Sequence, residues 1–274
     1  MPRSIWSGVI SFGMVSIPVN LYTATQEKDI AFHLLHKSCG NRLKQVRWCP
    51  FDEEEIEWND VVRGYEYAKD QYVTLTDEDF EKLPLPSKHT IGLSAFVRSQ
   101  EIDPIYYDKS YYLEPREGGA KPFALLMRVL EEKSLVGIAK IAIRNKEQLC
   151  ALRPQDRTLV LETLYYPDEI RVEQGIEAAD VDVSQREIEL AMTLVDALSE
   201  SFNPEQYQDD YRQAVMELIE AKRKGQEIVA PPPPPGNVID LMAALRESVE
   251  AAKKQRTEQP RRGREERDER RKAG

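Results

Sequence analysis

Residues 134–166 read SLVGIAKIAIRNKEQLCALRPQDRTLVLETLYY, and this stretch decides the fold class. Its apolar runs at 137–144 and 159–166 are short and rich in β-branched residues, which is typical of strands. The polar sequence Arg-Asn-Lys-Glu at 144–147 separates two apolar runs and predicts a tight turn. Comparable runs predict further strands at 91–97, 104–107 and 110–113, with a hairpin turn at 107–110. Many short strands with tight connections favour an antiparallel barrel or sandwich.

Helical periods appear at three places. Phe123, Leu126, Met127 and Leu130 follow Pro122 at spacings i, i+3, i+4 and i+7, so a helix interrupts the strands. Ser184 and Glu187 form a capping box ahead of a second helix. The apolar seam of that helix is predicted to contain Ile188, Ala191, Val195, Leu198 and Phe202.

A third helix is predicted to begin at Asn203-Pro204 and to carry a stripe of Tyr207, Tyr211, Val215 and Leu218. It should end in the basic cluster 222–224 before Gly225. Five prolines at 231–235 predict a stiff spacer. A short helix at 238–252 then presents Val238, Leu241, Met242 and Leu245 on one apolar face, continued by Val249 and Ala252.

These patterns divide the chain into five parts. We expect a core over 1–183, a helical arm over 184–225, a proline-rich linker over 226–237 and, over 238–252, a short helix whose apolar face is free to bind a partner. Residues 253–274 carry ten basic and five acidic residues with hardly any apolar ones, which predicts a disordered tail.

Charge is segregated along the chain, although the 274 residues have a formal net charge of -10. Residues 30–51 hold four basic residues and no acid, and residues 133–157 hold six basic against two acidic residues. Residues 52–82 hold twelve acidic against three basic residues, and residues 158–211 hold fourteen against two. Such segregation can focus a polyanion onto one surface, and the alternative is a set of ordinary solvated faces.

No segment approaches the ~18 apolar residues that cross a bilayer, and the N-terminus lacks the apolar run of a signal peptide. Three cysteines, at 39, 49 and 150, fit reduced thiols better than a disulfide framework. We therefore expect a cytoplasmic protein, associated with the nucleoid if it binds DNA.

Four long segments carry a family resemblance. In chain order they read IWSGVISFGMVSIPVNLY (5–22), VVRGYEYAKDQYVTLTDEDFEKL (61–83), EIDPIYYDKSYYLEP (101–115) and LVLETLYYPDEIR (159–171). Together they resemble the Ku family of bacterial non-homologous end joining, and the resemblance extends from about residue 3 to about residue 252.

The resemblance implies an α+β, mainly β fold: an antiparallel β-barrel core, a long hairpin arch that encircles DNA when two chains pair, and a C-terminal helical arm that reaches across the partner. It also implies a homodimer that binds ends of double-stranded DNA irrespective of sequence. Its implied partner is a bacterial ATP-dependent ligase, ligase D.

End binding without sequence preference requires cations that contact phosphates. The arch, placed at about 30–67, offers Lys37, Arg42, Lys44 and Arg47. A strand from Lys37 to Trp48 would span roughly 40 Å and would point Arg42 and Lys44 the same way. The second basic stretch offers Lys140, Arg144 and Lys146 as the floor of a cradle. The plain alternative for both sets is a solvated polar face.

Metal binding and catalysis find little support. His36, Cys39, Cys49 and Asp52 have the spacing of a degenerate zinc knuckle, but some Ku proteins carry a second cysteine where this chain has Asp52, and structural zinc sites are Cys-rich. We expect no metal site there. The chain has no HExxH, GxSxG or P-loop motif, so neither a cofactor nor an enzyme activity is predicted.

Two other function classes stay open at this point. A metal-dependent nuclease or phosphoesterase would use clustered carboxylates such as those at 77–79, although behind Thr76 these residues fit the first turn of a capped helix better. A protein-interaction module would bind nucleic acid only weakly, through its basic tail at 253–274. That module would lose all DNA binding on deletion of the tail.

Overall fold

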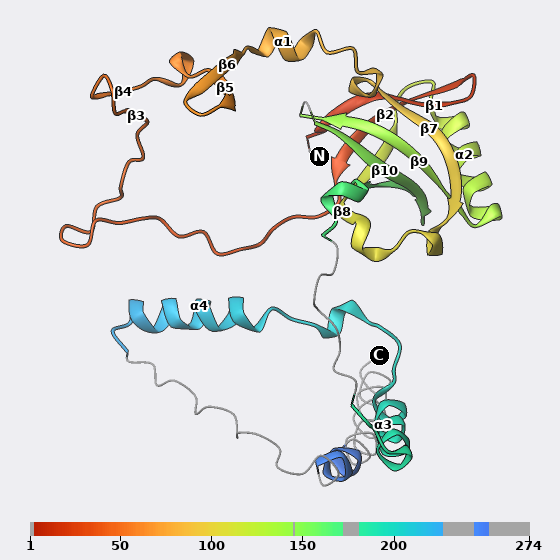
Figure 1. Cartoon of the computed structure of the whole chain (residues 1–274). Helices are drawn as coiled ribbons and strands as arrows, with labels where there is room; N and C mark the ends of the chain where they lie inside the picture. The colour runs from red at the N-terminus through yellow and green to blue at the C-terminus, as the bar shows by residue number, and fades with distance from the viewer. Residues whose placement is uncertain (1–2, 145, 172–180, 227–243, 252–274) are drawn as a thin grey trace, which may run out of the picture. The chain divides into compact units, whose positions relative to one another are not determined.

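The computed structural model describes residues 3–144, 146–171, 181–226 and 244–251. The chain divides into two compact units, with the boundary between residues 174 and 175. Seven strands of the first unit form a closed barrel in the order β1-β2-β8-β11-β10-β9-β7 (Figure 1). Their bounds are β1 Trp6–Phe12, β2 Val15–Thr23, β7 Thr90–Arg98, β8 Tyr107–Pro115, β9 Leu135–Ile143, β10 Lys146–Gln155 and β11 Thr158–Leu164.

One strand pair corrects the expectation of a purely antiparallel barrel. The pair β1 and β7, which closes the barrel, is parallel, with Val9 opposite Thr90 and Ser11 opposite Gly92. All other neighbouring strands of the barrel are antiparallel. The antiparallel strand β2 already returns the chain to the end of the barrel where β1 begins, and β7 starts at that same end. The connection between Thr23 and Thr90 nevertheless has 66 residues.

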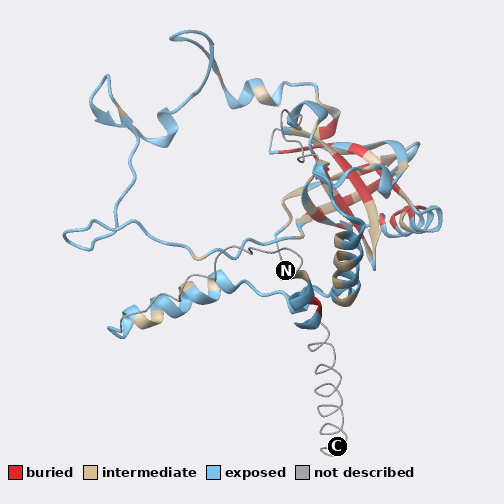
Figure 2. Ribbon diagram, turned by 60° about the horizontal axis from the view of Figure 1, so that its bottom comes forward, coloured by how far each residue is buried: buried red, intermediate tan, exposed pale blue. Residues whose placement is uncertain are grey.

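The core lies inside the barrel and beneath α2 (Ala120–Lys133), where Figure 2 shows the buried residues. Alternate residues of β2 point inward, so Ile17, Val19 and Leu21 are fully buried. The predicted helical face of α2 is confirmed, since Phe123, Leu126 and Leu130 are buried and Met127 packs against the cluster.

The predicted turn after β9 is confirmed, but two other local predictions were wrong. Arg144, at φ 52°, follows the last residue of β9, and β10 begins at Lys146. The predicted strand at 104–107 is a 3-10 turn, η4 (Pro104–Tyr106), because the Asp103 carboxylate accepts the Ile105 amide at 3.0 Å. No turn occurs at 107–110, where β8 continues unbroken.

Residues 24–89 connect β2 to β7, and we call this segment the open loop (Figure 1). It contains two small sheets, β3 (Trp48–Cys49) with β4 (Glu54–Glu55) and β5 (Arg63–Ala68) with β6 (Gln71–Leu75). Three short helical elements complete it: η1 (Trp58–Asp60), α1 (Asp77–Glu81) and η2 (Pro86–Lys88). Two further turns, η3 (Ser99–Glu101) and η5 (Pro167–Glu169), lie outside it.

The open loop differs from the single long hairpin that was expected at 30–67. The predicted strand from 37 to 48 is absent: residues 43–47 have no assigned strand, and only a bridge between Leu35 and Arg42 precedes them. The loop is instead a chain of small local hairpins.

The second unit contains α3 (Gln185–Leu198), η6 (Pro204–Gln206), α4 (Asp210–Arg223) and a helix over 244–251. The Ser184–Glu187 capping box is confirmed. The next helix begins at Asp210, not at 203–204, because Asn203 caps only one 3-10 turn whereas the Asp209 carboxylate accepts the Arg212 amide at 2.9 Å. The prolines at 231–235, residues 238–243 and the tail at 253–274 lie outside the described residues.

The end of the open loop is fastened to the barrel by a polar contact. Ser87, which is buried, donates a hydrogen bond to the Glu147 carboxylate of β10 at 2.6 Å. This bond lowers the pKa of Glu147, and the Lys140 ammonium at 3.3 Å lowers it further, while partial burial opposes both. The indole of Trp6 adds a second contact by donating to the Lys88 carbonyl at 2.9 Å.

We predict that Gly8→Ala destabilises the barrel by about 2 kcal/mol, because overpacking a tight site costs this much. A Cβ at Gly8 would collide with the Trp6 ring and with the His89 carbonyl, which is backbone and cannot rotate away. Gly92→Ala is the matched control, since a Cβ there meets nothing within 4 Å. Urea denaturation measures both, and equal stability of the two variants would contradict this account of the closure.

We also predict that Ser87→Ala lowers the free energy of unfolding by about 1 kcal/mol at pH 7. The pKa of Glu147 is depressed below its ordinary 4.5, so its stabilisation is present above that pH and is lost as the pH falls through the folded value. The difference from the parent chain should therefore shrink in acid.

Ser94→Ala is the control for this prediction, because Ser94 donates to a neutral carbonyl, that of Ile138. Its effect on stability should be the same at each pH. Denaturation curves between pH 7 and pH 3 make the comparison, and a pH-independent effect of Ser87→Ala would refute the assignment.

Candidate nucleic-acid interface

The open loop has no core of its own. No residue from 22 to 85 is buried, and Figure 2 shows the segment almost entirely exposed. Large apolar side chains are exposed as well, among them Phe51 (91%), Phe32 (69%) and Trp58 (66%). A segment without buried contacts gains little from folding on itself, and its exposed surface is available for contact with a binding partner.

The first half of the open loop presents Lys37 and Arg42 to solvent. Lys37 lies in the turn of a small hairpin in which the His36 amide donates to the Asn41 carbonyl at 2.8 Å. Arg42 follows on the returning side, opposite Leu35. Among the described residues neither cation forms an ion pair, so both charges are free to meet a phosphate.

Lys44 and Arg47 have intramolecular contacts that sequence reasoning missed. The Lys44 ammonium lies 3.0 Å from the Glu55 carboxylate, and both side chains are more than half exposed. The Arg47 guanidinium stacks 4.0 Å above the Trp58 ring. Exposed ion pairs of this kind contribute little, so a phosphate can replace Glu55 at low cost.

The prediction that a strand points Arg42 and Lys44 in the same direction is wrong, because residues 43–47 form no strand. The structure nevertheless brings these two residues together in another way. Both line a shallow groove whose other walls include Phe32, Leu34 and Leu43. The groove combines two cations with three apolar side chains.

The second basic set lies on β9 and β10. The Lys140 ammonium is 3.3 Å from the Glu147 carboxylate and 5.9 Å from the centre of the Tyr166 ring. The Lys146 ammonium is 2.9 Å from Glu169, a contact that raises the pKa of Lys146. Arg144 is the only one of the three predicted cations without an ion pair among the described residues, so this set has less free charge than its sequence suggests.

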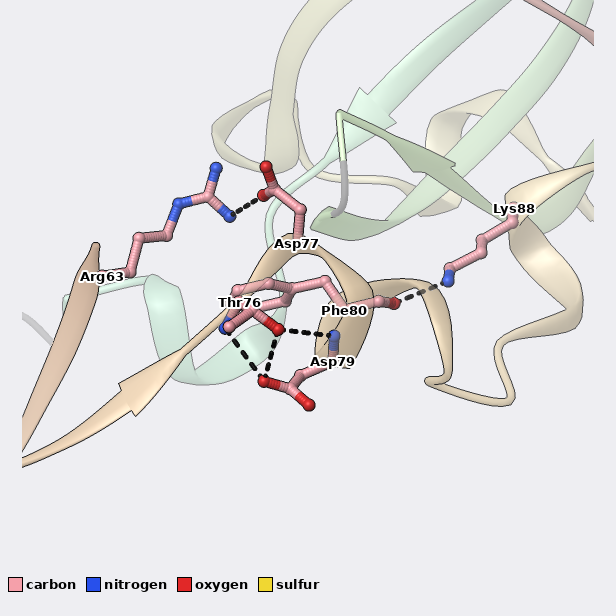
Figure 3. Close-up of polar contacts among 6 residues, drawn as sticks. All are labelled: Arg63, Thr76, Asp77, Asp79, Phe80 and Lys88. Carbon is pink, nitrogen blue, oxygen red and sulfur yellow. Dashed lines mark hydrogen bonds and ion pairs between the residues drawn. The ribbon is translucent and has the colours of Figure 1, made fainter. Parts of the chain in front are cut away.

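The second half of the open loop is held by the polar contacts in Figure 3. The Asp79 carboxylate accepts the Thr76 amide at 2.9 Å, which closes a capping box and lowers the pKa of Asp79. The Arg63 guanidinium lies 3.1 Å from Asp77 and 5.1 Å from the Phe80 ring. Lys88 then donates to the Phe80 carbonyl at 2.7 Å, so α1 is tied to the end of the loop.

The carboxylates at 77 and 79 are therefore used to build α1. Within the part of the chain that the structure describes, no group of three or more His, Cys, Asp or Glu side chains is placed to hold a metal ion. The knuckle residues form two separate pairs: His36 Nδ1 lies 3.1 Å from Cys39 Sγ, and Cys49 Sγ lies 3.1 Å from Asp52 Oδ2.

The predicted partner-binding residues are only partly described. Val238, Leu241 and Met242 lie outside the described residues, whereas Leu245 is half-buried beside α3. Val249, one helical turn later, is 5% exposed. Among the described helices, none combines the length and apolar character needed to cross a membrane.

Comparison with known proteins gives a consistent result. The family model for the Ku70/Ku80 beta-barrel domain matches residues 11–190. The protein named "Non-homologous end joining protein Ku" from Heliobacterium modesticaldum is 42% identical over 257 residues, which cover 92% of this chain and 93% of that protein. The protein of the same name from Archaeoglobus fulgidus is 43% identical and is covered over its whole length.

The protein of this name from Symbiobacterium thermophilum is 46% identical over 258 residues, which cover 93% of this chain. The chain spans 64% of the length of that relative. A barrel-domain match over residues 11–190, together with relatives aligned over nearly all of both chains, identifies the chain as a member of the Ku family.

Proposed function

We propose that this chain binds the ends of double-stranded DNA without reading their sequence, as a ring formed by two copies, in double-strand break repair by non-homologous end joining. The chain is a scaffold that recruits and stimulates an ATP-dependent ligase, ligase D, and has no enzyme activity of its own. Its place of action is the nucleoid. The relatives' shared name supports the repair process.

The open loop is the observation that carries this proposal. Residues 22–85 bury nothing, yet both ends of the loop are fixed to a closed barrel. A duplex inside the loop would supply the contacts that the loop lacks. Lys37 and Arg42 would contribute free cations to the phosphates, and Lys44 would join them by exchanging Glu55 for a phosphate.

Sequence independence follows from the kind of contact. Phosphate contacts by lysine and arginine position a protein on DNA without distinguishing base pairs. A closed ring also excludes entry along the duplex, so only a free end can thread through. End preference is thus a matter of topology, and affinity is a matter of charge.

The second unit supplies an argument for two copies. One side of α3 is apolar and exposed. Its residues, each between 40% and 63% exposed, are Ile188, Met192, Val195 and Leu198. A helix with an exposed apolar seam is stabilised when another surface covers it. One open loop surrounds only part of a duplex, so a pair related by a two-fold axis completes the ring. The pair would have a mass of about 63 kDa, twice the 31.5 kDa chain.

The proposed ring predicts that the chain binds a linear duplex and fails to bind a covalently closed circle of the same sequence. Threading needs an end, whereas a groove on the surface of the chain would bind both molecules. Electrophoretic mobility shifts with the linear form, the circle and the circle reopened by one restriction cut make the comparison. Equal affinity for the linear form and the circle would refute the ring.

Another prediction concerns the cations of the open loop. Replacing Lys37 and Arg42 together by Ala should lower the slope of log affinity against log salt by about 1.8 per chain, since each lost phosphate contact contributes about 0.9. Melting temperature should hardly change, because both side chains are exposed.

Lys69→Ala is the matched control, because Lys69 is an exposed lysine in the acidic half of the same loop. It should leave the salt slope nearly unchanged. Binding isotherms at several salt concentrations measure all three proteins. If the double variant keeps the parent slope, the DNA surface lies elsewhere, with the β9–β10 set as the next candidate.

A further inference from the structure

The helix α3 has two apolar sides that differ in exposure. Leu190, Leu194 and Ala197 follow one another at i, i+4 and i+7 and are half-buried. Ile188 and Met192 belong to the exposed seam described above. Something within the second unit therefore covers the first side and leaves the second side open.

The helix over residues 244–251 lies beside α3. Leu245 lines a groove together with Ile188, Met192 and Val195 of α3. Arg246, the next residue, lines a second groove on α3, which includes Glu189 and Thr193.

The positions of these two grooves fix where the C-terminal helix lies. At 100° per residue, Glu187 and Ala191, which also line the first groove, occupy one flank of the Leu190–Leu194–Ala197 side, and Thr193 and Glu189 occupy the other flank. A helix that contacts both flanks lies over the side between them. Val249 follows Leu245 at i+4, so it lies on the same face of this helix, and it is 5% exposed.

We propose that the Leu190–Leu194–Ala197 side of α3 is a docking surface for residues 244–251, and we call this contact the latch. The latch uses Leu245 and Val249, which lie on the apolar face of the predicted partner-binding helix. The C-terminal helix is therefore held by α3 in the free protein and is not a loose tether. Ligase docking, which rests on the proposed function, requires the latch to open.

The latch is weak enough to open. It buries one valine and half-buries one leucine, and the helix over 244–251 is short. Removing a single buried aliphatic side chain from such a contact changes the equilibrium roughly tenfold. A partner that binds the same apolar face can therefore displace α3, while α3 keeps the face covered in its absence.

Hydrogen exchange on the full chain, without DNA or ligase, tests the latch directly. Val249→Asp places a carboxylate at the buried position and should speed amide exchange of residues 244–251 roughly tenfold. Ser248→Asp adds the same charge at the neighbouring exposed position and should leave exchange unchanged. Equal exchange rates in the two variants would overturn the latch.

A second variant changes the α3 side of the proposed contact. Leu194→Asp should speed exchange of residues 244–251 to the same degree, whereas Gln185→Asp, at an exposed position of α3 that lines neither groove, should have a small effect. Far-UV circular dichroism checks that α3 stays folded. If Leu194→Asp keeps α3 folded and leaves exchange of 244–251 unchanged, α3 does not hold this helix.

Adding ligase D to the parent chain tests the competition. Release predicts that residues 244–251 become protected by the ligase while the Leu190–Leu194 segment of α3 exchanges faster. Protection of both segments would show that the ligase binds the closed latch and would overturn the competition. The exchange rates of the free variants do not depend on DNA binding, so failure of the latch and failure of the ring are distinguishable.

Discussion

The closure of the seven-strand barrel is the constraint on which the rest of this structure depends. Strand β7 pairs with β1 on one side and with β9 on the other, so the chain that leaves the barrel after β2 must return to it at Thr90. Residues 24–89 are that segment, and the barrel holds both of its ends although no residue from 22 to 85 is buried. The proposed binding element therefore takes its fixed ends from the barrel and not from a core of its own.

Charge in this chain is arranged in local pairs more than in patches. Lys44 with Glu55, Lys140 with Glu147 and Lys146 with Glu169 each place an acid beside a predicted DNA-binding cation. Each pair neutralises its cation locally, in a chain whose net charge is -10. They are also exposed enough for solvent to screen them, so a dense row of phosphates can compete for the cations. The arrangement favours binding of a polyanion that the proposed ring encloses over binding of a polyanion that only collides with the surface.

Local patterns predicted the elements whose cause is local. The alternation in β7 and β9, the helical spacing of α2 and the Ser184 capping box all appear where the sequence places them. The errors lie where distant contacts decide. Residues 107–110 have turn chemistry, yet β11 pairs with β8 at both Tyr107 and Leu113 and draws the segment into one strand. The candidate cations were found by charge alone, but their carboxylate partners come from other elements, as in the pair of Lys146 with Glu169. The strand through 43–47 was expected from the hairpin arch that the resemblance implies and from its reach, but only isolated backbone hydrogen bonds form at Leu43 and Arg47 and no strand results.

The absence of a core in the open loop has a consequence for how its length can vary. The entropy of closing a loop grows only with the logarithm of its length, so doubling the loop costs about 0.6 kcal/mol. Because no residue from 22 to 85 is buried, an insertion between the local hairpins disturbs no buried packing. The length of the loop is thus almost uncoupled from the stability of the barrel, and the seven strands can keep their register while the loop is lengthened or shortened.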